Sequence, residues 1–290
     1  MASKDHISVC VTTYKRRESL YRLLDTLKRQ ETNGFFTYSI VVVDNDRLES
    51  GKTAVHSARN STNVTIEYFS EQEQNISSVR NKSIEKSGGN LIAFIEDDEF
   101  PNDSWLLSLY NVYKNHHCNG VLGPVVPHFT EKTHRWLEAA IREVRYTRTA
   151  DFRTGQLLKW NETHTGNALV EKPVFERPDG KFKASFGITG GEDTDFFKRA
   201  IKDGYSFVWS SASLVYDFVF PERRRLAWIL KRAFRTGKIY SRVDLENLPL
   251  SQKAISIARF IVSFLVFLLF LLPSIMLGPR VFIKCLIRLV

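Results

Sequence analysis

The sequence predicts an α/β fold: a Rossmann-like, mixed and mainly parallel sheet with helices on both faces. Strand-like and helix-like stretches alternate along the first half of the chain, which is typical of proteins built from parallel strands. Two of the predicted strands end in acidic residues, and ligands of such sheets bind beyond the carboxyl ends of the strands. The 290 residues, 43% of them hydrophobic, are enough for one large domain with an appendage.

Each element of the first half follows from its local pattern. Residues 17–30 form a helix, because their leucines recur at the helical spacing i, i+3, i+4 and i+7. Residues 76–89 form a second helix that two glycines close, and residues 104–115 form a third. The predicted strands are runs rich in β-branched residues: 6–13, 38–46, 63–70 and 90–99.

The middle of the chain is less regular. Residues 120–129 read as a strand that enters a proline-rich turn, and residues 182–201 as a glycine-rich loop that leads into a helix. Residues 223–238 read as an amphipathic helix with Ile229, Ala233 and Phe234 on one face and bases on the other.

The last forty residues predict C-terminal membrane-associated helices. Residues 260–278 contain no charge, and a membrane span needs about 20 apolar residues. Pro273 interrupts the segment, so a kinked or re-entrant hairpin is an alternative to a span, and a buried helix is a further alternative. The bases that precede it fit the positive-inside rule and attraction to anionic lipid.

Charge and cysteine content narrow the classes of partner and compartment. The net charge of +9 and the pI of about 9.4 imply an anionic partner: a nucleic acid, a membrane surface or a phosphorylated small molecule. The three cysteines lie far apart without metal-ligand spacing, which favours a reducing cytoplasmic setting. The first ten residues contain no long apolar stretch, so no secretory signal is expected.

Four consecutive acids, Glu96 to Glu99, end the strand predicted at 90–99. Carboxylates at a strand end are hard oxygen ligands that suit Mg²⁺ or Mn²⁺, and Mg²⁺ commonly shares its coordination with substrate phosphates. A metal would offset the repulsion between these charges. The alternative is a solvated acidic turn.

A second acidic motif, GGEDTDFF, begins at Gly190. The two glycines permit a tight turn, after which Glu192 or Asp193 is placed to cap the following helix. The functional alternative is a carboxylate general base that takes a proton from an attacking hydroxyl. Polar residues at other strand ends are suited to hold a nucleotide, with Asp44 accepting from a base N–H and Arg80 near a uracil or phosphate.

The order of these motifs along residues 6–240 resembles the family 2 inverting glycosyltransferases of the GT-A fold. The stretches that carry the resemblance are VCVTTYKRRESLYRLLDTL, VVVDND, NISSVRNKSI, AFIEDDE, VLGPV, GNALV, GGEDTDFF and LAWILKRAFRTG. The resemblance implies a metal-dependent enzyme that moves a sugar from a nucleotide sugar, expected to be a UDP-sugar, to a saccharide hydroxyl.

The resemblance also implies roles for individual residues. The expected nucleoside pocket consists of Thr12, Tyr14, Asp44 and Arg80. The D-x-D motif of the family corresponds to Glu96, Asp97 and Asp98, with Asp98 as metal ligand, Glu96 as ligand or ribose contact and Asp97 beside the donor. The expected general base is Asp193, with Glu192 orienting the acceptor, and the diphosphate contacts of the basic helix are Arg232 and Arg235.

One departure from the family pattern concerns the third metal ligand. Many relatives carry a histidine in the strand before the basic helix, whereas this chain has Tyr216 there with Asp217 beside it.

The expected organisation is a catalytic domain at 1–221, a basic helix at 222–249 that closes the site and a membrane-anchoring segment at 250–290. The expected location is the inner face of the cytoplasmic membrane. The expected acceptor is a lipid-linked saccharide, a homodimer through the apolar tail is possible, and no nucleic-acid partner is expected. Two alternatives remain open: a sugar-phosphate nucleotidyltransferase and a non-enzymatic, membrane-bound module for anions.

Overall fold

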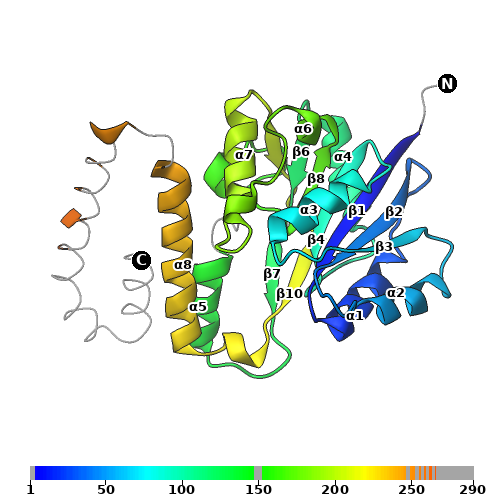
Figure 1. The fold of residues 1–290 in the computed structure, drawn as a ribbon, viewed down its shortest axis with the longest axis horizontal. Coiled ribbons are helices and arrows are strands. Elements are labelled where there is room, and N and C mark those ends of the chain that lie inside the picture. The colour runs from blue at the N-terminus through cyan, green and yellow to red at the C-terminus, as the bar shows by residue number, and fades with distance from the viewer. Residues whose placement is uncertain are drawn as a thin grey trace. The chain divides into compact units, whose positions relative to one another are not determined.

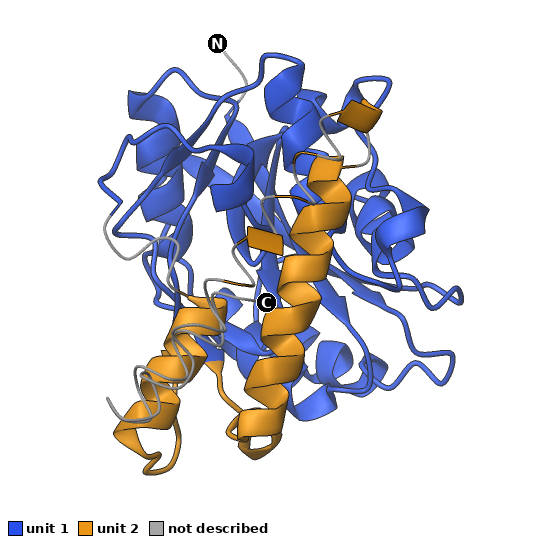
Figure 2. Ribbon diagram, turned by 90° about the vertical axis from the view of Figure 1, so that its left-hand side faces the viewer, with its two compact units in different colours: residues 1–126, 149–217 blue, residues 127–148, 218–290 orange. Residues whose placement is uncertain are grey.

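The computed structural model describes residues 4–146, 152–245 and 249–251, together with residues 255, 258, 261, 262 and 265. The chain divides into two compact units (Figure 2). The first unit comprises residues 1–126 and 149–217, and the second comprises residues 127–148 and 218–290. The predicted boundaries at 221 and 249 differ from this division, in which residues 127–148 group with the C-terminal part of the chain.

The first unit is built on a seven-stranded sheet with the order β3-β2-β1-β4-β8-β6-β9 (Figure 1). The strands are β1 (Asp5–Thr13), β2 (Phe36–Asp44), β3 (Ile66–Ser70), β4 (Leu91–Glu96), β6 (Gly120–Leu122), β8 (Asn167–Glu171) and β9 (Phe207–Trp209). Strand β8 runs antiparallel to both of its neighbours, and the other pairs are parallel. The predicted mixed, mainly parallel sheet is therefore confirmed.

Helices cover both faces of this sheet, as predicted. They are α1 (Arg17–Leu27), α2 (Lys52–Arg59), α3 (Ile76–Glu85), α4 (Trp105–Asn115), α6 (Pro173–Glu176) and α7 (Glu192–Lys202). Alternate residues of β1 point to opposite faces. Val9 and Val11 join the cluster that contains α1, α2 and α4 residues, whereas Cys10 joins the cluster with α6 and α7 residues. The short helix α2 was not predicted.

A small second sheet has the order β5-β10-β7. Its strands are β5 (Glu99–Pro101), β10 (Val215–Phe218) and β7 (Val125–His128). The antiparallel register of β5 and β10 pairs Glu99 with Asp217 and Phe100 with Tyr216. This pairing therefore places Asp217, from the C-terminal part of the first unit, beside the acidic run that follows β4.

The second unit contains the helices α5 (Arg135–Arg145) and α8 (Leu226–Leu245), which share one apolar cluster. Ile229 and Ala233 are buried as the amphipathic pattern predicts, but Phe234 is 65% exposed. The helix α5 was not predicted. Arg224 binds Glu131 at 2.8 Å and ties the start of α8 to the segment before α5.

The predicted membrane segment at 260–278 lies outside the described residues, apart from residues 261, 262 and 265. Among the residues that the structure does describe, no helix combines the length and the apolar character that crossing a bilayer requires.

Candidate active site

The carboxyl ends of three neighbouring strands bring the predicted polar residues together at one edge of the sheet. Strand β1 lies between β2 and β4, and its register pairs Thr13 with Asp44 on one side and Thr12 with Glu96 on the other. The expectation that two acidic strand ends share an edge is correct, because β2 and β4 are the two neighbours of β1 in the sheet. Tyr14 follows directly and is 41% exposed.

Asp44 is fully buried and holds the loop after β2 in place. Its carboxylate accepts the backbone N–H groups of Asp46 (2.9 Å) and Gly51 (2.7 Å) and the hydroxyl of Tyr68 (2.9 Å). Burial and the adjacent Asp44 carboxylate raise the pKa of Tyr68. The sequence analysis did not predict that Asp44 closes this loop. The available signal was Gly51, seven residues after Asp44, whose N–H the carboxylate accepts. The expected contact of Asp44 with a base stays a prediction.

Arg80 is buried and links the two acidic motifs. It projects from α3, donates through Nη2 to Oε1 of Glu96 at 2.6 Å and forms an ion pair through Nη1 with Glu192. Although burial acts in the opposite direction, the carboxylates of Glu96 and Glu192 raise the pKa of Arg80. The sequence predicted that Arg80 lies near a uracil or phosphate, and the structure places it between carboxylates from β4 and α7. A nucleotide contact stays a prediction.

Glu192 and Asp193 open α7 directly after two glycines with positive φ, Gly190 (84°) and Gly191 (96°). Gly191 is the N-cap residue, so neither acid occupies that position. Burial raises the pKa of Glu192 while Arg80 opposes the shift. The Oε2 atom of Glu192 is buried and has no hydrogen-bond partner among the described residues. Asp193 is only partly buried, and its Oδ1 accepts the N–H of Thr194 at 2.7 Å. Asp193 is therefore the more accessible of the two carboxylates.

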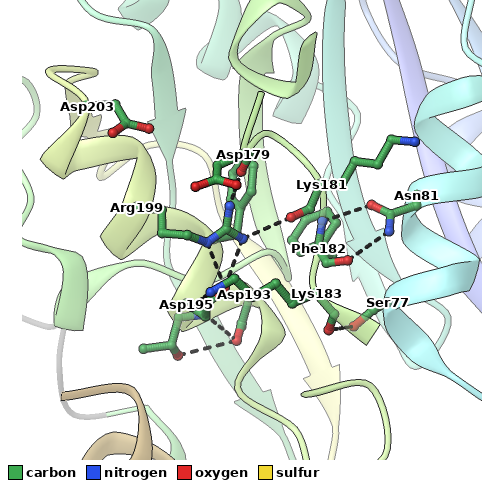
Figure 3. A network of polar contacts seen from close by, with 12 residues as sticks. Ser77, Asn81, Asp179, Lys181, Phe182, Lys183, Asp193, Asp195, Arg199 and Asp203 are labelled. Carbon is green, nitrogen blue, oxygen red and sulfur yellow. Dashed lines mark hydrogen bonds and ion pairs between the residues drawn. The ribbon is translucent and has the colours of Figure 1, made fainter. Parts of the chain in front are cut away.

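The chain segment before this turn is fastened to α3 by side-chain bonds to backbone (Figure 3). Asn81 accepts the N–H of Phe182 at 2.9 Å and donates to its carbonyl at 2.8 Å. Ser77 donates to the carbonyl of Lys183 at 2.9 Å. On the other side, Arg199 binds Asp195 of its own helix at 2.8 Å and two backbone carbonyls of the same segment. These bonds hold residues 179–183, which precede the turn before Glu192 and Asp193, and the sequence patterns did not reveal them.

The acidic run after β4 is buried rather than a solvated turn. Asp97 accepts the hydroxyl of Thr13 at 2.8 Å and pairs with Arg16 at 2.7 Å, and Asp98 lies 3.3 Å from the same Arg16 nitrogen. Burial raises the pKa of Asp97 to about 6 against the opposing effect of Arg16. Burial, followed by nearby carboxylates, raises the pKa of Glu99 well above its usual range.

At the family's histidine position this chain has Tyr216, and the structure shows where Tyr216 and its neighbour Asp217 lie. Tyr216 stacks on Phe100 with ring centroids 5.2 Å apart. Its neighbour Asp217 is fully buried and lies opposite Glu99 in the small sheet. The structure therefore brings Asp217 to the acidic run, whereas sequence reasoning left open which of the two residues would be there.

The donor set fits a divalent cation that shares its ligands with substrate. Glu96 and Asp98 offer carboxylate oxygens, and Mg²⁺ is commonly held by one or two carboxylates together with phosphates and water. Within the described ranges, no three His, Cys, Asp or Glu side chains are arranged to hold a metal by themselves. The metal stays a prediction.

The two arginines of the basic helix, Arg232 and Arg235, lie on α8 in the second unit. Their expected contact with a diphosphate stays a prediction.

The fold and this edge of carboxylates define a class of protein. Residues 8–177 match the family model described as glycosyl transferase family 2. The chain belongs to this family of enzymes, which decides against the nucleotidyltransferase and the non-enzymatic binding module.

Two curated proteins show the relationship across most of the chain. The chain is 32% identical over 247 residues to the succinoglycan biosynthesis protein ExoM of Rhizobium meliloti, which covers 83% of this chain and 76% of that protein. It is 27% identical over 237 residues to the glycosyltransferase AglE of Haloferax volcanii, which covers 80% of this chain and 72% of that protein.

Solved structures show the same fold at low sequence identity. The structure of S. aureus TarS with UDP has a TM-score of 0.59 and 16% identity, and covers 86% of this chain and 68% of that one. The structure of TarS with UDP-GlcNAc has the same TM-score and identity, and covers 86% and 69%. The expected GT-A architecture is therefore confirmed for the described part of the chain.

Proposed function

We propose that this family 2 glycosyltransferase moves a sugar from a UDP-sugar to a hydroxyl of a saccharide acceptor, with inversion at the anomeric carbon. The observation that carries the proposal is the Arg80 bridge, which joins Glu96 at the end of β4 to Glu192 at the start of α7. It ties a donor-side carboxylate to the motif that contains the candidate base. The TarS complexes with UDP and UDP-GlcNAc support the choice of donor.

The chemistry is divided among three groups of side chains. Asp193 takes the proton of the acceptor hydroxyl as it attacks the anomeric carbon, a role that contributes on the order of 10²–10⁴-fold in rate. Glu192 is fixed by Arg80 beside it and orients the acceptor. Thr12, Tyr14 and Asp44 hold the nucleoside at the strand ends.

The leaving group is a nucleoside diphosphate, on which negative charge increases as the glycosidic bond breaks. Asp98 and Glu96 are the residues that would hold a Mg²⁺ or Mn²⁺ ion there. When bound, such an ion supplies positive charge to the departing diphosphate.

The charge of the chain and its apolar stretch support a proposed acceptor and a proposed location. The net charge of +9 and the apolar stretch at 260–278 support an enzyme tethered at the cytoplasmic face of a membrane, acting on a lipid-linked saccharide. The kinship with a succinoglycan biosynthesis protein supports a role in polysaccharide assembly. Deletion of residues 250–290 should leave hydrolysis of the donor intact and abolish transfer to the lipid acceptor. Equal loss of both activities would contradict this division.

The proposal is tested by single-turnover transfer with full-length protein in detergent, a panel of nucleotide sugars and a lipid-extract acceptor. Asp193→Asn should lower the transfer rate by about 10²–10⁴-fold and leave the affinity for UDP unchanged. Asp203→Asn, at the far end of α7, is the matched control and should transfer at the wild-type rate. Wild-type activity in Asp193→Asn would refute the assignment of the base.

A further inference from the structure

Arg16 lies in a stretch that carries the family resemblance, but neither that resemblance nor the proposed chemistry has assigned it a role. It lies immediately after β1 and is the N-cap residue of α1, where its side chain makes no capping hydrogen bond. The preceding residue, Lys15, has a φ of 54°, a left-handed conformation that is uncommon outside glycine. The backbone before Arg16 is therefore held in an unfavourable conformation, which is often found at functional sites.

Only one edge of the Arg16 guanidinium is engaged. Nη1 lies 2.7 Å from Asp97 and 3.3 Å from Asp98. Nε and Nη2 make no hydrogen bond with any described residue, and the side chain is 43% exposed. An arginine presents five N–H donors in a rigid fork, so the Nε–Nη2 edge remains available to an outside ligand.

The carboxylates orient this fork. Asp97 is buried and is itself fixed by the hydroxyl of Thr13 at 2.8 Å. The Thr13–Asp97–Arg16 chain joins the ends of β1 and β4 and limits the positions that the guanidinium can take. Pre-ordering of this kind lowers the entropic cost of binding a ligand.

The chemistry of the open edge suits a phosphate. A planar pair of N–H donors matches two phosphate oxygens and gives charge-assisted, bidentate bonds. The proposed metal ligand Asp98 is only 3.3 Å from the guanidinium, so Arg16 lies at the diphosphate end of the proposed donor site rather than at its nucleoside end.

We infer that Arg16 binds the diphosphate of the nucleotide-sugar donor through Nε and Nη2, while Asp97 and Asp98 hold its other edge. This inference rests on the proposed function. Arg16 thereby supplies a fixed positive charge to the leaving group next to the acidic run, whether or not a divalent cation is bound. It is a binding residue that the sequence motifs did not single out.

The test is calorimetric titration of full-length protein with UDP and with uridine, each in EDTA and in Mn²⁺. Wild type should prefer UDP over uridine even in EDTA. Arg16→Gln should reduce that preference by about tenfold or more and leave uridine affinity unchanged, because uridine lacks the phosphates. Arg17→Gln is the matched control, since Arg17 is exposed and, among the described residues, pairs only with the exposed Glu18.

Arg16→Lys distinguishes a loss of phosphate binding from a purely structural effect, because lysine keeps a positive charge beside Asp97 but lacks the planar fork of N–H donors. It should also reduce the preference for UDP while its melting temperature stays near that of wild type. Three results would overturn the inference: an unchanged UDP preference in both variants, a tighter UDP affinity of Arg16→Gln in Mn²⁺, or no UDP preference of wild type in EDTA. A wild type that fails to bind UDP even with Mn²⁺ would contradict the proposed function itself.

Discussion

Arg80→Gln is expected to destabilise the protein strongly, because the substitution removes the cation that pairs with both Glu96 and Glu192. The Arg80 side chain is 7% exposed and that of Glu192 is 8% exposed, so neither has appreciable contact with water. Breaking a buried ion pair by removing one partner costs about 3–5 kcal/mol, since the other charge stays buried without compensation. Glu96 is 28% exposed and retains some hydration, so most of the cost arises at Glu192.

The size of the effect should depend on pH. Burial already raises the pKa of Glu192, and loss of Arg80 raises it further above its value in the unfolded chain. A carboxyl with a raised native pKa stabilises the fold below its unfolded pKa and loses that contribution as the pH rises through the native pKa. The deficit of Arg80→Gln relative to wild type should therefore shrink on acidification from about pH 8 to about pH 5.

Urea denaturation of the full-length chain, followed by circular dichroism, measures the free energy of unfolding. A loss of about 3–5 kcal/mol corresponds to a melting temperature lower by about 6–20 °C for a unit of this size. Arg29→Gln is the matched control: its partner Asp25 is 2.7 Å away, but both side chains are about half exposed. Such exposed pairs contribute about 0.2–1 kcal/mol.

Two results would refute the reasoning about Arg80. One is a variant within about 1 kcal/mol of wild type at pH 8, below the range that holds for buried pairs. The other is no recovery of stability when Glu192→Gln is added to Arg80→Gln, because removal of the stranded charge should restore most of the loss.

Three further predictions concern the rest of the first unit. Gly187→Ala should destabilise the protein by about 1–3 kcal/mol in thermal melting, because the added Cβ would lie 1.6 Å from Oδ1 of Asn75, the N-cap of α3. Gly88→Ala is the control in the same assay, because nothing lies within 4 Å of the Cβ added there. Asp44→Asn should cost about 1.5–3 kcal/mol in urea denaturation without nucleotide, since an amide cannot accept all three bonds that the carboxylate accepts; unchanged stability would limit Asp44 to ligand binding. Burial raises the pKa of Cys10 to about 11, so at pH 8 only about one thiol in a thousand is ionised and iodoacetamide should leave Cys10 unmodified in the native protein, as peptide mass mapping would show.

The sequence by itself determined the alternation of strands and helices and the place of the site. Hydrophobic period and turn residues are local signals, and they sufficed for β1, β2, β3, β4, α1, α3 and α4. The convergence of Asp44 and Glu96 followed as well, because parallel strands place their carboxyl ends at one edge of the sheet. The short helix α2 and the helix α5 were not predicted from the sequence.

Only the tertiary structure decided which side chains meet. Arg80 joins Glu96 to Glu192, which lies 112 residues after Arg80, and Asp217 comes to lie opposite Glu99. Such pairings depend on how helix and sheet layers pack, and no local period encodes them. The same holds for Arg16. Its position after β1 was visible in the sequence, but the sequence did not show which edge of its guanidinium pairs with Asp97 and Asp98. Packing across layers, rather than local propensity, decides which charges are compensated within the fold and which remain available to a ligand.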